Sequence, residues 1–206
     1  MHPLGHKYYY TLDGGNPNVV LDLNDKQCIR DVVDWCYHVR GLGCIALTDH
    51  DMIQASLYCA EYVKEIGYPM EVITGAECSV CNPHLEIGHD GVHLLCLGIT
   101  SLPPYNPRTS VSKMIEAVHD VGGYVIMSHP IEYPESFKRY AHLLDGYEYQ
   151  NGNHFDFEDG AKILKSQGLE IKAFNNSDYH YGGVQFGKMD HLNLPYNIYI
   201  DDPLLD

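Results

Sequence analysis

The feature that most constrains the fold of this chain is a regular alternation of short apolar runs with segments of helical periodicity. Apolar residues recur at helical spacing in five segments, which predicts helices over residues 24–40, 53–66, 111–121, 134–144 and 157–167. Short apolar or β-rich runs lie between them, at residues 44–47, 70–77, 92–99, 124–127, 146–149 and 171–174. Strands that are separated by helices pair in parallel. The pattern therefore leaves two architectures open, a β/α barrel and a doubly wound sheet.

Two local signals refine this expectation. Asn24 and Gln27 have the spacing of a capping box, which predicts that the first helix begins there. Between Cys81 and Gly91 the chain is too short for a helix with its connections, so we expect a hairpin. A hairpin would bring His93 close to Glu77 in spite of their separation in sequence.

Length and composition favour one cytoplasmic domain. We expect the 206 residues, 45% of them hydrophobic, to form a single domain over residues 1–206. No stretch reaches the ~20 apolar residues of a membrane helix, and no signal-peptide pattern opens the sequence. Seven scattered cysteines favour a reducing compartment over a disulfide framework. The formal charge of −15 argues against wide binding to long nucleic acid, and short or small anionic partners stay open.

Potential metal ligands follow nearly every predicted strand. Thr48-Asp49-His50 follows the first, Glu77 ends the next, and three further strands are followed or ended by His129, by Glu148 and by Asp178 with His180. Since the carboxyl ends of parallel strands form the active-site edge of barrels and open α/β sheets, we expect these side chains to converge. Histidine and carboxylate without paired thiolates are typical of zinc, manganese or iron in an open catalytic site. The single CxxC pair, Cys78 and Cys81, is a weak metal signal, and no GxGxxG, phosphate loop or GxSxG motif occurs.

Five short motifs in order resemble the polymerase and histidinol phosphatase (PHP) superfamily. They are Leu47-Thr48-Asp49-His50-Asp51, Gly75-Ala76-Glu77, the run of residues 92–98 that contains His93, Ser128-His129-Pro130, and Ser177-Asp178-Tyr179-His180. The resemblance spans most of the chain. It implies a distorted (β/α)7 barrel with three divalent metal ions (Zn, Mn or Fe) at the carboxyl edge of the strands, and phosphoester hydrolysis as the activity.

The same resemblance implies a role for each metal ligand. Glu77 would bridge two ions, His93 and His129 would bind the second, and Asp178 would complete the first. His50, His180 and Asp13 would bind the third. The N-terminal family motif, His-x-His, has its nearest counterpart at His6-Lys7-Tyr8 with Asp13-Gly14 after it, so Tyr8 stands where the second histidine belongs and His2 is a possible substitute.

The resemblance also supports a mechanism. A bridging hydroxide would attack phosphorus, because divalent metals lower the pKa of bound water. Asp49 could orient a metal ligand, and His180 or His154 could protonate the leaving group. The candidate contacts with the substrate are Glu148 and the cationic side chains of Arg108, Lys138 and Arg139.

Three functions remain open from the sequence. The first is a phosphatase acting on a small phosphomonoester, either histidinol-phosphate-like or a nucleotide. The second is an exonuclease-like phosphodiesterase on short oligonucleotides or nucleoside bisphosphates. The third, of another class, is a non-catalytic metal-binding module, for which Tyr8 is the only support. We expect a small phosphorylated substrate as partner, with short nucleic acid as an alternative and no membrane.

Overall fold

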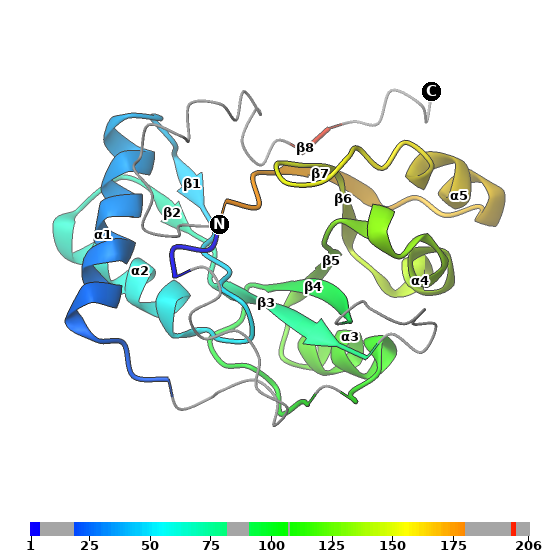
Figure 1. Cartoon of the computed structure of the whole chain (residues 1–206), viewed down its shortest axis with the longest axis horizontal. Coiled ribbons are helices and arrows are strands. Elements are labelled where there is room, and N and C mark those ends of the chain that lie inside the picture. Colours follow the sequence, from blue (N-terminus) through cyan, green and yellow to red (C-terminus); the bar gives the residue numbers. More distant parts are fainter. Residues whose placement is uncertain (5–18, 82–90, 107, 180–198, 201–206) are drawn as a thin grey trace.

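The computed structural model describes residues 1–4, 19–81, 91–106, 108–179 and 199–200. Their fold is mixed α/β (Figure 1). The α-helices are α1 (Leu23–His38), α2 (Gln54–Ile66), α3 (Val111–Asp120), α4 (Pro134–Tyr140) and α5 (Gly160–Gln167). The strands are β1 (Cys44–Ile45), β2 (Glu71–Val72), β3 (Gly75–Val80), β4 (Val92–Leu97), β5 (Tyr124–Met127), β6 (Gly146–Asn151), β7 (Lys172–Asn176) and β8 (Tyr199–Ile200). Two short 3-10 helices, η1 (Pro130–Glu132) and η2 (Ala141–Leu143), flank α4.

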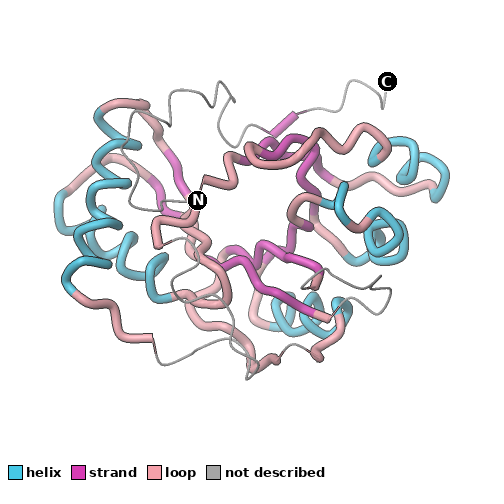
Figure 2. The backbone as a smooth tube through the Cα atoms, in the orientation of Figure 1, coloured by secondary structure: helices cyan, strands magenta, loops and turns pink. Residues whose placement is uncertain are grey.

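The described strands form two sheets. The larger has six strands in the order β3-β4-β5-β6-β7-β8, and the smaller is the parallel pair β1-β2. Within the larger sheet β5, β6 and β7 are parallel to one another, whereas β3-β4, β4-β5 and β7-β8 are antiparallel. Figure 2 shows the strands curving around a centre, with α3, α4 and α5 on their outer side and α1 and α2 beside the small sheet. The predicted α/β class is confirmed, but the described strands do not form one closed barrel.

Backbone hydrogen bonds connect the two sheets at one edge. The segment that follows β1 runs beside β3, where His50 forms an isolated parallel bridge with Glu77. On its other side Thr48 N–H donates to the carbonyl of Met1 (2.8 Å), and His2 N–H donates to the carbonyl of Tyr179 beyond β7 (2.7 Å). Chain segments that are distant in sequence therefore meet around His2, His50 and Glu77.

The helices pack through two apolar clusters. One cluster joins the larger sheet to α3, α4 and α5, with Val118, Met127, Phe137 and Tyr147 among its buried members. The other joins α1 and α2 to the small sheet through Ile29, Val33, Leu47 and others. No helix of the described residues has the length and apolar character needed to cross a bilayer.

Most predicted elements are confirmed, with three corrections. The predicted strand over residues 70–77 is two strands, β2 and β3, which belong to different sheets. The helix predicted from Pro134 is α4 followed by η2. The capping box of α1 is formed by Asp22 and Asp25 and not by Asn24 and Gln27, since each of these carboxylates accepts the other residue's backbone N–H, at 2.8 and 3.0 Å. The predicted hairpin is confirmed by the antiparallel pairing of β3 with β4.

The cap at Asp22 gives a test of this helix boundary. Asp22→Ala should lower the free energy of unfolding by about 1 kcal/mol, because the N–H of Asp25 loses its acceptor. Asp22→Asn is the matched control and should remain near wild type, since asparagine caps a helix about as well as aspartate. Urea denaturation of the three proteins measures the difference. Equal stability of all three would show that the helix does not depend on this cap.

Candidate metal centre

Strained backbone marks the edge where the strands converge. Among the described residues, three that are not glycine have positive φ: Asp51 (56°), His129 (28°) and Asp178 (45°). Each follows a strand or its continuation at the carboxyl end, and each lies at or beside a predicted metal ligand. Such conformations cost about 1–3 kcal/mol each and concentrate at functional sites. The geometry therefore points to this edge as the place of function.

One face of Glu77 meets two imidazoles. Glu77 Oε1 lies 3.0 Å from His93 Nδ1 and 3.4 Å from His129 Nε2, and the two nitrogens are 3.2 Å apart. Although this oxygen is buried, it accepts no hydrogen bond from any described residue. Ligands about 2.0–2.1 Å from a tetrahedral ion would lie about 3.3 Å from one another. The three atoms therefore fit the ligand set of one divalent ion.

The other face of Glu77 meets His2. His2 Nε2 is 3.2 Å from Glu77 Oε2 and 3.2 Å from Asp178 Oδ1, and its ring stacks on His50 with 4.7 Å between centroids. His2, His50 and Glu77 offer ligand atoms within 4.8 Å of one another, as do Glu77, His93 and His129. Glu77 belongs to both groups, which is the arrangement of a carboxylate that bridges two ions.

Burial and mutual contact shift the protonation of these groups. Burial lowers the pKa of His2, but its contacts with Asp178 and Glu77 raise it to about 9 overall. His129 behaves similarly: burial opposes protonation, and Glu132 and Glu77 raise its pKa to about 10. The pKa of Glu77 is held well below its ordinary value, because the adjacent imidazoles His129, His2 and His93 outweigh the effect of burial. The metal-free centre therefore holds protons where a cation would sit.

Two further acids support the ligands from behind. Asp49 Oδ1 accepts the N–H of Leu4 (2.8 Å), which anchors the segment that carries His2, and burial raises the pKa of Asp49 to about 6. Glu148 Oε2 accepts the N–H of His129 (2.7 Å). The amides of Asn151 and Asn176 also donate to Glu148, at 2.7 and 2.6 Å. Burial, with the nearby charges of Asp178 and Glu77, raises the pKa of Glu148 to about 6.

A cavity of about 340 Å³ opens beside the ligands. The described residues that line it are His50, Glu77, His93, His129, Glu132, Asn153, His154 and Asp178. Arg108, Lys138 and Arg139, which we predicted as phosphate contacts, are exposed and are not among these residues. Glu148 lies beneath the centre and lines a different cavity, which is mostly apolar. Because no lysine or arginine is among the described lining residues, bound cations would be the attraction for an anion here.

A third group of ligand atoms lies at the rim of this cavity. His129, Glu132 and His154 form it, and Glu132 joins the other two at 3.1 Å on each side. Glu132 was missed from the sequence, although its i, i+3 spacing from His129 across Pro130 is a signal that could have found it. His154, predicted as a proton donor, turns Nε2 toward Asp178 Oδ2 at 3.6 Å.

Of the N-terminal residues considered as ligands, His2 lies in the described part of the chain. This histidine, considered as a substitute, contacts Glu77 and Asp178. His6, Tyr8, Asp13 and His180 lie outside the described residues, so their predicted roles stay predictions.

Proton release tests this ligand set. Metal uptake at pH 7 should release protons, because His2 and His129 are protonated in the metal-free centre (pKa about 9 and 10) and an ion binds neutral imidazole. Affinity should therefore weaken as pH falls from about 9. Calorimetry of Zn²⁺ binding in buffers of different ionisation enthalpy counts the protons. The count should fall in His129→Gln and stay unchanged in His119→Gln, a surface control; uptake without proton release would contradict the assignment.

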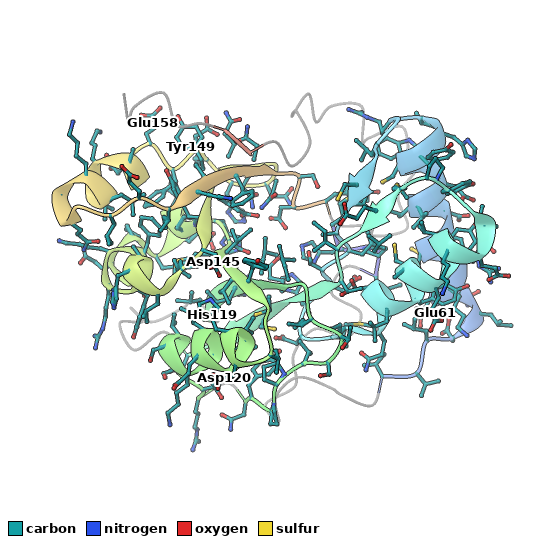
Figure 3. The ribbon with its side chains drawn as sticks, turned by 180° about the vertical axis from the view of Figure 1, so that it is seen from behind. Glu61, His119, Asp120, Asp145, Tyr149 and Glu158 are labelled. Carbon is teal, nitrogen blue, oxygen red and sulfur yellow. The ribbon has the colours of Figure 1, made fainter. Side chains whose placement is uncertain are left out.

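The position of Glu148 predicts a structural effect. Glu148→Ala should lower the free energy of unfolding of the metal-free protein by about 1–3 kcal/mol, because the buried donors of His129 and Asn151 and the partly buried amide of Asn176 lose their acceptor. Guanidinium denaturation would measure the loss, with the exposed Glu158→Ala as control (labelled in Figure 3). Unchanged stability together with weaker substrate binding would instead assign Glu148 to the substrate.

Comparison with known proteins gives structural relatives. No protein-family model and no curated protein matches the sequence. Solved structures do match the fold, among them three of low sequence identity. A proposed metal-dependent phosphoesterase from Bifidobacterium adolescentis superposes with a TM-score of 0.58 and 16% identity, over 84% of this chain and 87% of the other. An amidohydrolase from Chromobacterium violaceum, solved with sulfate and no metal, has a TM-score of 0.54 and 18% identity, over 74% and 82%.

The third is a two-domain protein from Bacteroides vulgatus that contains a predicted PHP-like metal-dependent phosphoesterase. It superposes with a TM-score of 0.53 and 18% identity, over 74% of this chain and 46% of that one, so this chain spans less than half of its length. At these identities the likeness is one of fold. It agrees with the resemblance in the sequence motifs, and the chain accordingly has the fold of the PHP-like metal-dependent phosphoesterases.

Proposed function

We propose that the chain is a metal-dependent phosphoesterase that hydrolyses a small phosphomonoester. The observation that carries the proposal is the position of Glu77, whose two oxygens face two different groups of imidazoles. The cavity beside it, with no lysine or arginine among its described lining residues, suits a phosphate bound through cations. The names of the structural neighbours, metal-dependent phosphoesterases among them, support the same chemistry.

The proposed centre holds three ions of zinc, manganese or iron, within a distorted β/α barrel. Two of the ions would share Glu77, one with His2 and Asp178 and the other with His93 and His129. The third uses His50 with Asp13 and His180, both outside the described residues. When bound, divalent cations lower the pKa of a coordinated water and neutralise the phosphoryl oxygens.

The chain's own groups orient the substrate and move protons. Hydrolysis joins the oxygen of water to phosphorus, breaks the bond between phosphorus and the ester oxygen, and leaves an alkoxide that needs a proton. His154 is the described candidate for this donor in its doubly protonated form, because its Nε2 faces the cavity while its Nδ1–H is held by Glu132. Burial lowers the pKa of His154, so this form is the less populated one at neutral pH. His180 is the other candidate. Asn153 also lines the cavity, and its amide donates to the carbonyl of Asp178, which restrains that ligand.

Kinetics with chromogenic esters test the proposal. Manganese-loaded protein should release nitrophenol from p-nitrophenyl phosphate faster than from bis(p-nitrophenyl) phosphate, and chelator should abolish the release. Glu77→Ala should lower kcat/KM at least ~100-fold, since it removes a ligand of two ions, whereas loss of a residue that only supports a ligand costs ~10–100-fold. His129→Ala should lose less, because it serves one ion.

Exposed Glu61→Ala is the matched control and should keep wild-type rates (labelled in Figure 3). A preference for the diester would favour the phosphodiesterase alternative. Absence of hydrolysis in protein that is loaded with metal would refute the proposed activity and favour a binding module.

A further inference from the structure

Glu132 touches two imidazoles with its two carboxylate oxygens. Oε2 lies 3.1 Å from His129 Nδ1, and Oε1 lies 3.1 Å from His154 Nδ1. The two rings stack on each other, with 4.3 Å between their centroids and 23° between their planes. One carboxylate therefore contacts the same nitrogen, Nδ1, of two parallel imidazoles.

The backbone after β5 places Glu132 over His129. His129 has φ 28° and ψ 56°, and the 3-10 turn η1 that follows is closed by a hydrogen bond from Glu132 N–H to the His129 carbonyl (3.1 Å). This tight turn folds the Glu132 side chain back onto the ring three residues earlier. Glu148 holds the start of the turn through the N–H of His129.

The neighbours of His129 define which ring nitrogen carries the proton. Tyr133 donates its hydroxyl proton to the carbonyl of Ser128, so toward His129 Nδ1, 3.3 Å away, it can offer only a lone pair. Glu132 also offers a lone pair to Nδ1. A nitrogen that faces two acceptors is the protonated one. When His129 is neutral, as metal binding requires, its lone pair is therefore on Nε2, the atom that faces Glu77 and His93.

The same reasoning orients His154. With Nδ1–H donated to Glu132 Oε1, the free nitrogen is Nε2, which faces the cavity and Asp178. The pair of His119 and Asp145, both labelled in Figure 3, makes a simpler contact, of one ring nitrogen with one carboxylate oxygen at 2.8 Å.

From this geometry we infer that Glu132 is a positioning residue that fixes the tautomer and orientation of His129 and His154 together, so that Nε2 of each ring faces the metal centre. The inference rests on the proposed metal centre but not on any particular reaction. Carboxylates that hold the outer N–H of a metal-binding histidine orient the ring and raise its basicity, and their loss typically weakens metal binding ~10–100-fold. Glu132 extends this role to a second ring, which no sequence motif assigned.

Metal binding and histidine NMR test the inference without any substrate. In zinc-loaded protein labelled with ¹⁵N-histidine, long-range ¹H–¹⁵N spectra should show His129 and His154 protonated on Nδ1. Assignment follows from His129→Gln and His154→Gln. In Glu132→Ala and Glu132→Gln at least one of these Nδ1–H signals should shift or exchange with water. The zinc ion that His129 binds should be held ~10–100-fold less tightly in these variants than in wild type.

The control is Glu135→Ala, an exposed acid in the first turn of α4, which should leave spectra and affinity unchanged. His154→Gln should keep zinc affinity near wild type, because the ring of His129 remains held by the other oxygen of Glu132. Unaltered Nδ1–H signals in both Glu132 variants would overturn the inference. So would the loss of one whole zinc equivalent with the other affinities unchanged, since Glu132 would then itself be a ligand. Failure of phosphatase activity would leave these results untouched.

Discussion

The structure of this protein depends on one buried carboxylate. Glu77 is 2% exposed and is kept ionised by imidazoles on both of its faces. A buried charge without such partners would cost several kcal/mol, so the surrounding segments are constrained to supply them. They come from the N-terminal segment (His2), from β4 (His93) and from the turn after β5 (His129), with His50 alongside. The site thus connects the N-terminal segment to the ends of the paired strands β3, β4 and β5.

That concentration of charge has a cost in the metal-free protein. The strained residues Asp51, His129 and Asp178 surround the same point, and a hydrogen bond to a neighbour restrains each of them. The N–H of Asp51 donates to the backbone carbonyl of Glu77, and the N–H of His129 donates to the carboxylate of Glu148. The backbone carbonyl of Asp178 accepts from the amide of Asn153. Cations that bind only the folded state would stabilise it by mass action. The binding free energy of the metals would therefore offset the unfavourable free energy of the strained backbone, which in the metal-free protein is offset by packing of the apolar clusters.

The sequence predicted most elements because periodicity is a local property. The helix boundary at Gly67, the strand Tyr124–Met127 and the hairpin between β3 and β4 followed from spacing and turn residues, whereas α1 ends at His38, before the predicted stop at Gly41. The proximity of His93 to Glu77 followed from that hairpin and is confirmed at 3.0 Å. The missed cap at Asp22 is local too, since Asn24 offered an equally good signal two residues later.

What the sequence by itself determined is the order of helices and strands and the type of residue at each strand end, because both follow from short-range patterns. Only the tertiary structure placed His2 against Glu77. Long-range hydrogen bonds bring its segment in, from the N–H of His2 to Tyr179 and from the N–H of Leu4 to Asp49. Only the tertiary structure also showed that Glu132 contacts His154, which follows β6 in the chain. A contact between residues that are distant in sequence produces no periodic pattern in the sequence.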